Sequence, residues 1–185
     1  MQAAGTSGMK LDVRKIVITG ILAAIAILLG VTRLGFIPVP NISGSATIMH
    51  VPAIIGGIME GWLVGLLVGG IFGLFSFLQA TSPLFKNPLV SVLPRLFIGV
   101  TAYLSYRWLK SRNEYAALVL AGVVGTLTNT VLVLGMAVIT GLLDPGLIPG
   151  IIPQAIAEIV IAVIIVVAVV TGWKRVEGRR GGSSV

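Results

Sequence analysis

Four side chains able to bind a polar ligand interrupt apolar stretches of this sequence: His50, Arg95, Asn129 and Glu158. A charged side chain in hydrocarbon costs about 2.5–3.5 kcal/mol on insertion scales, so each one needs a partner or a ligand. Arg95 and Glu158 each lie about seven residues from the same end of their stretches, roughly 10 Å deep at 1.5 Å per helical residue. Two interpretations follow: a structural ion pair between them, or a polar pocket in which all four take part.

Further polar residues extend the expected binding set, whereas no catalytic arrangement accompanies it. Gln79 lies near the same end as the four residues above, and Asn41 lies in the Pro/Gly-containing loop 35–45. The chain has one histidine, six carboxylates and no cysteine, which excludes thiolate chemistry, disulfides and Cys-ligated metals. It also contains no Ser–His–Asp order, phosphate loop or metal-ligand spacing. We expect no catalytic residue, metal or cofactor, so energy from ATP would have to come from a partner protein.

The composition determines where such a pocket could lie. The 185 residues are 56% hydrophobic and 10% charged, with a mean hydropathy of +1.07. Soluble domains carry about 45–50% apolar and about 25% charged residues. A soluble enzyme and a disordered chain are therefore excluded, and we expect an all-α polytopic membrane protein with a single transmembrane domain over residues 1–185. The net charge of +7 does not indicate nucleic acid, because the basic residues sit at the ends of apolar runs.

Six apolar runs predict six transmembrane helices, since a span needs about 20 apolar residues and short loops leave room for six. Glu60–Gly61 is expected to be a tight reversal between the second and third runs. Loops rich in proline and glycine separate the others. The expected spans are about 16–33, 46–60, 62–79, 89–109, 115–143 and 151–173.

The basic residues orient these spans. If successive spans cross the membrane in opposite directions, ten of the thirteen Lys and Arg residues lie on one side of it. They are Lys10, Arg14, Lys15, Arg107, Lys110, Arg112, Lys174, Arg175, Arg179 and Arg180. Arg33 and Lys86 fall on the other side, and Arg95 lies inside a span. The positive-inside bias then predicts that both termini are cytoplasmic. Trp62, Trp108 and Trp173 all fall at the cytoplasmic ends, as an interfacial belt would.

Small residues predict close helix contacts. Gly61, Gly65, Gly69 and Gly73 recur every four residues along the third run, and Gly20 and Ala24 have the same spacing in the first. Small residues let helix backbones approach closely in lipid. They indicate either packing inside the bundle or a docking face for another membrane protein. For the docking alternative we select Gly20, Ala24, Gly61 and Gly65.

In the order and spacing of its motifs, the chain resembles the substrate-binding S components of the energy-coupling factor (ECF) vitamin transporters over residues 14–175. The segments that carry the resemblance are RKIVITGILAAIAILLG, GFIPVPNISGSA, TIMHVPAIIGGIMEGWLVGLLVGGIFGLFSFL and VLPRLFIG. Gly20 and Ala24 match the family's Ala-x-x-x-Ala pattern, with glycine replacing the first alanine. Glu60-Gly61-Trp62 departs from the family's apolar-Gly-Pro turn.

The resemblance implies a six-helix bundle in the plasma membrane with both termini cytoplasmic. It also implies a vitamin pocket near the outer face, closed by the loop after the first span. Spans one to three would dock on a transmembrane coupling protein bound to two ABC ATPases. A self-sufficient small transporter or channel is the competing class.

The substrate is expected to be a water-soluble vitamin, and the sequence most resembles the branch for pantothenate and hydroxymethylpyrimidine or pyridoxine. Arg95 would suit the carboxylate of pantothenate, because a guanidinium binds carboxylates bidentately. Asn129 and His50 would serve its hydroxyl and amide groups. A neutral or cationic pyrimidine would instead make Glu158 the direct ligand.

Overall fold

The chain folds as a bundle of helices that run along one long axis. A computed structural model describes residues 12–38, 45–80 and 82–181. The main helices are α1 Val13–Val31, α2 Val51–Glu60, α3 Trp62–Leu78, α5 Leu93–Leu109, α6 Glu114–Ile139 and α7 Ile148–Gly181. Short segments lie between them: β1 Phe36–Pro38, β2 Ser45–Thr47, α4 Pro88–Ser91 and two 3-10 turns, Pro83–Lys86 and Pro145–Leu147.

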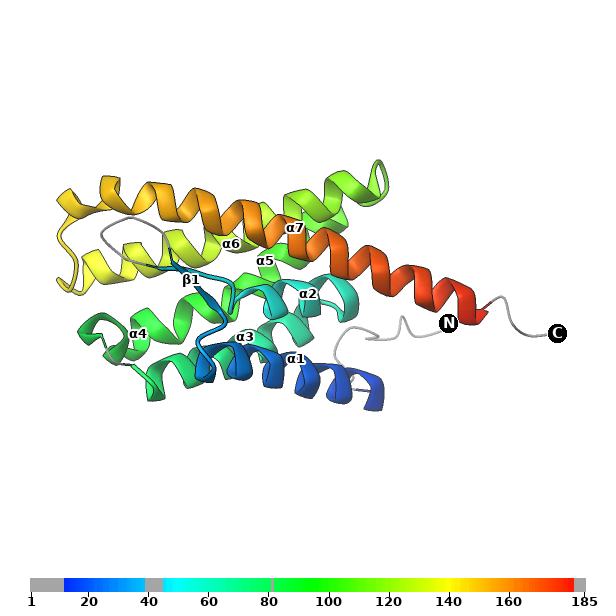
Figure 1. The fold of residues 1–185 in the computed structure, drawn as a ribbon, viewed down its shortest axis with the longest axis horizontal. Helices are drawn as coiled ribbons and strands as arrows, with labels where there is room; N and C mark the ends of the chain where they lie inside the picture. Colours follow the sequence, from blue (N-terminus) through cyan, green and yellow to red (C-terminus); the bar gives the residue numbers. More distant parts are fainter. Residues whose placement is uncertain (1–11, 39–44, 81, 182–185) are drawn as a thin grey trace, which may run out of the picture.

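These six helices confirm the predicted all-α membrane bundle. Four segments of the described chain are long and apolar enough to cross a bilayer: Val13–Val31, Pro88–Leu109, Glu114–Ile139 and Pro145–Glu177. The start of α1, the turn between α5 and α6, and the end of α7 lie at one end of the bundle, at the right of Figure 1. We call it the terminal end. The connection between α6 and α7 lies at the opposite end, with α4, and we call that the loop end (Figure 1).

Side-chain caps and a glycine set the helix boundaries. Asp12 accepts a hydrogen bond from the Val13 amide at the start of α1, and Asn113 accepts one from the Ala116 amide in the first turn of α6. Such caps satisfy amides that have no partner inside the helix. The predicted reversal at Glu60–Gly61 is confirmed, because Gly61 alone separates α2 from α3. Its φ of 100° lies in a region that side chains other than glycine rarely adopt.

The second helix begins later than the sequence indicated. The expected span 46–60 contains only the 10-residue α2, about 15 Å long at 1.5 Å per residue, which is about half of a bilayer core. Residues 45–47 are extended because β2 pairs antiparallel with β1, with Phe36 opposite Thr47 and Pro38 opposite Ser45. Pro52 then suits the first helical turn, where a missing amide costs nothing. Every residue of α2 from Val51 to Ile58 is buried.

Three further boundaries differ from the expected spans. The fourth is divided at Val92 into α4 and α5, and the fifth ends at Ile139, not at residue 143. The sixth begins at Ile148 and continues to Gly181. At 34 residues α7 is about 51 Å long, so it extends well beyond a core of about 30 Å.

Glycines bring α2, α3 and α5 into backbone contact. A Cβ atom on Gly65 would lie 2.8 Å from Gly99 Cα and 2.9 Å from Gly57 Cα. Gly69 faces the Arg95 carbonyl, and Gly73 faces Val92 and Ser91. The internal-packing interpretation therefore describes Gly65, Gly69 and Gly73, and we withdraw Gly65 from the docking face. This close seam brings the start of α5, with Arg95, against α3.

Candidate functional site

The four polar residues singled out in the sequence are all buried toward the loop end. The exposed fractions are 0% for His50, 4% for Arg95, 8% for Asn129 and 4% for Glu158. His50 precedes α2, Arg95 lies in the first turn of α5, and Asn129 and Glu158 lie inside α6 and α7. The charge of Arg95 acts on both His50 and Glu158. We call these four residues the polar centre.

Arg95 is held between aromatic rings. Its guanidinium carbon lies 5.7 Å from the centre of the Phe72 ring and 5.1 Å from that of the Phe85 ring. Both distances are within the range of cation–π attraction. One terminal nitrogen donates to the Val90 carbonyl, whereas Nε has no hydrogen-bond partner. The side chain is thus fixed in place with one buried donor unused.

Glu158 is engaged by the β1–β2 hairpin. Its Oε1 accepts a hydrogen bond from the Thr47 amide at 2.8 Å and another from Gln154 Nε2 at 3.0 Å. Among the ion pairs of the described residues, none joins Glu158 to Arg95. The structural ion pair considered from the sequence is therefore absent from this part of the chain. The carboxylate instead fixes strand β2 to α7.

His50 and Asn129 each have one unused polar atom. His50 Nε2 lies 3.0 Å from the Thr126 hydroxyl oxygen, which connects the start of α2 to α6. His50 Nδ1 and Asn129 Oδ1 have no hydrogen-bond partner. Together with Arg95 Nε, they are the buried side-chain atoms without a partner in the described chain. Buried polar groups are normally hydrogen-bonded, so three such atoms in one region point to a ligand.

The other residues selected from the sequence are dispersed. Gln79 is exposed at the end of α3, and Asn41 lies outside the described residues. Gly20 and Ala24 are exposed on α1, and a Cβ on Gly20 would meet nothing within 4 Å. Gly61 is the turn between α2 and α3. Among the described residues, no three histidine or acidic side chains gather as metal ligands.

Sequence reasoning did not select several residues that contact the polar centre, among them Phe72 and Thr47. Phe72 lies on α3 three residues after Gly69, on the face that packs against α5, so the glycine spacing already contained a signal for it. The contact of Thr47 with Glu158 spans 111 residues and depends on the hairpin register. No local sequence pattern predicts such a contact.

The described chain is thus a helical membrane bundle around a buried polar centre. The family model for "ECF transporter, substrate-specific component" matches residues 14–170. The chain therefore belongs to the family of ECF substrate-specific components, as its resemblance indicated.

A solved structure has a similar fold. A structure reported as the S component of a bacterial ECF transporter superposes with a TM-score of 0.63 at 18% identity, covering 89% of this chain and 96% of that one. At that identity the likeness shows the fold alone.

Two relatives carry pantothenate in their names. The pantothenic acid transporter PanT of Lactococcus lactis subsp. cremoris is 36% identical over 108 residues, which are 48% of this chain and 54% of that protein. The pantothenate transporter PanT of Leuconostoc mesenteroides is 27% identical over 135 residues, 68% of this chain and 66% of that protein. This chain thus spans about half the length of the first relative and about two thirds of the second.

Proposed function

We propose that the chain binds pantothenate, a small carboxylate with hydroxyl and amide groups, in the polar centre. The observation that carries this proposal is the set of three unused buried atoms, Arg95 Nε, His50 Nδ1 and Asn129 Oδ1. A buried polar atom without a partner is costly, about 1–3 kcal/mol, and a ligand that fills all three removes that cost. The names of both PanT relatives support the same substrate.

The chemistry of the three atoms matches that ligand. Arg95 Nε is a cationic donor, suited to a carboxylate oxygen. Asn129 Oδ1 is an acceptor, suited to a hydroxyl or an amide N–H. If His50 Nε2 donates to Thr126, Nδ1 is a second acceptor. One cationic donor and two acceptors complement one carboxylate, with hydroxyl and amide groups beside it.

The hydrogen bonds that Glu158 already accepts favour an anionic substrate over a pyrimidine. A neutral or cationic pyrimidine would need the carboxylate as its direct ligand. That carboxylate already accepts from Thr47 and Gln154, and its exposed fraction is 4%. In our proposal Glu158 instead holds the hairpin over the pocket, and the positive charge of Arg95 is left for the substrate.

The chain carries out no chemistry in this proposal and supplies only recognition. It works in the plasma membrane with both termini cytoplasmic, and it accepts the vitamin from outside. A transmembrane coupling protein and two ABC ATPases supply the energy, as the family resemblance implies. The exposed small face of α1 at Gly20 and Ala24 is the part of the docking expectation that we retain.

Calorimetric titration of the purified chain with pantothenate tests the proposal. Arg95→Ala is expected to weaken binding about 100-fold, because a buried charge contact is worth about 3 kcal/mol. Arg95→Lys keeps the charge without the donor fork and should lose roughly tenfold. Lys86→Ala is the matched control, since it removes an exposed cation at the loop end, and its affinity should stay within roughly twofold of wild type.

Two results would contradict the proposal. Tighter binding of hydroxymethylpyrimidine than of pantothenate would reassign the substrate. Equal losses for Arg95→Ala and Lys86→Ala, with both variants folded, would show that general electrostatics and not the polar centre attract the anion.

A further inference from the structure

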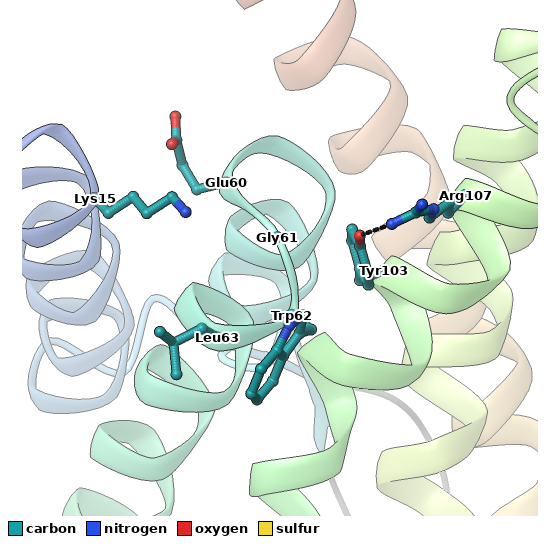
Figure 2. Close-up of a pocket in the computed structure, with 7 residues that line it drawn as sticks. All are labelled: Lys15, Glu60, Gly61, Trp62, Leu63, Tyr103 and Arg107. Carbon is teal, nitrogen blue, oxygen red and sulfur yellow. Dashed lines mark hydrogen bonds between the residues drawn. The ribbon is translucent and has the colours of Figure 1, made fainter. Parts of the chain in front are cut away.

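A polar pocket lies at the terminal end of the bundle, opposite the polar centre. A cavity of about 450 Å³ is bounded by Lys15 of α1, the turn from Glu60 to Leu63, and Tyr103 and Arg107 of α5. Figure 2 shows Lys15 and Arg107 on opposite sides of the Gly61 turn. We call this cavity the inner pocket.

The acidic residue of the inner pocket, Glu60, forms a salt bridge with a residue outside the pocket. Arg14 Nε lies 2.9 Å from Glu60 Oε1, and Arg14 also pairs with Glu177 at 2.7 Å. The Glu60 side chain is only 7% exposed. Glu60 is therefore paired with Arg14, which does not line the cavity, and the three cations Arg14, Lys15 and Arg107 exceed the two carboxylates Glu60 and Glu177 by one charge.

The two cations of the inner pocket, Lys15 and Arg107, have no acidic partner among the described residues. Arg107 donates a 2.7 Å hydrogen bond to the Tyr103 hydroxyl, a neutral partner (Figure 2). The ion pairs among the described residues involve Arg14 and Lys174, and neither Lys15 nor Arg107 takes part in them. The pocket thus presents an ammonium and a guanidinium, a donor set that suits a phosphate.

The surroundings of the pocket indicate that this phosphate belongs to a lipid. Trp62 and Leu63 form an apolar part of the wall at the start of α3. Tryptophan is enriched where acyl chains meet headgroups. The terminal end also carries most of the basic residues, as the cytoplasmic side of a membrane protein does, and that leaflet contains the anionic lipids.

We propose that the inner pocket binds the phosphate headgroup of an anionic phospholipid through Lys15 and Arg107. Trp62 and Leu63 contact the glycerol and upper acyl region of the same lipid. This site is independent of the vitamin, because it lies at the other end of the helices and shares no residue with the polar centre.

Native mass spectrometry of the full chain, with added phosphatidylglycerol or phosphatidylcholine, tests the proposal. A basic residue near an anionic lipid strengthens binding about fivefold, so the double variant Lys15→Ala/Arg107→Ala should bind phosphatidylglycerol about 25-fold more weakly. Its weak binding of phosphatidylcholine should not change. Lys15→Ala alone should lose about fivefold, and it keeps the Arg107–Tyr103 contact in case the double variant is unstable.

Arg112→Ala is the matched control, because Arg112 is an exposed cation at the same end that does not line the pocket. Equal losses for this control and for Lys15→Ala would overturn the proposal, since diffuse surface charge would then explain the binding. So would wild-type binding that does not distinguish the two lipids. Competition with glycerol phosphate distinguishes a lipid ligand from a soluble anion. Full displacement of the lipid by millimolar glycerol phosphate would assign the pocket to a soluble phosphate instead.

Discussion

Removing the Glu158 carboxylate should release strand β2 from α7. Its Oε1 accepts from the Thr47 amide at 2.8 Å, and the residue is 4% exposed. A buried hydrogen bond to a charged acceptor contributes about 2 kcal/mol, and a neutral amide acceptor about 1 kcal/mol. Glu158→Ala should therefore raise local opening at β2 about 30-fold, and Glu158→Gln about fivefold.

Hydrogen exchange measured by mass spectrometry on peptides that contain residues 45–49 checks these values. Peptides from α6 serve as the internal reference and should exchange as in wild type. Pantothenate affinity should fall only by the fraction of chains that the change leaves open, because Glu158 acts through the hairpin. If Glu158→Ala abolished binding while exchange at residues 45–49 stayed unchanged, the carboxylate would be a direct ligand and our reasoning would be refuted.

Two other predictions concern packing and topology. Gly65→Ala should lower the melting temperature, because its Cβ meets the backbone of Gly57 and Gly99, and such overpacking costs about 1–3 kcal/mol. Gly20→Ala, with open space around it, should have a melting temperature at or above that of wild type. Equal melting temperatures for the two variants would contradict the close packing of α2, α3 and α5 at Gly65. A reporter fused after Val185 should be active only in the cytoplasm, given the ten basic residues expected on that side. Activity confined to the outside would reverse the topology.

Sequence patterns predicted the helical bundle because membrane spans leave a strong local signal. Runs of apolar residues with basic ends appear in composition alone, and the turn at Gly61 is marked by a single residue. The late start of α2 was not predictable in this way. It depends on pairing between Phe36–Pro38 and Ser45–Thr47, whose register is a tertiary property.

The same contrast applies to the polar centre. His50, Arg95, Asn129 and Glu158 stand out because polar groups are rare in such runs, so their burial could be anticipated. Their partners could not, because Thr47 lies 111 residues from Glu158, and Thr126 lies 76 residues from His50. Gly65 shows a second limit of prediction from sequence, because the same glycine spacing fits an internal helix contact and an external docking face equally well.

The most direct test of the central claim is to identify the small molecule that the chain retains during purification. Wild-type protein and Arg95→Ala, expressed with pantothenate in the medium, would be purified in parallel and analysed by native mass spectrometry. We expect one pantothenate per wild-type chain and none on Arg95→Ala, because the buried guanidinium donor is what the carboxylate requires. A different ligand on the wild type, or pantothenate retained equally by Arg95→Ala, would contradict the account.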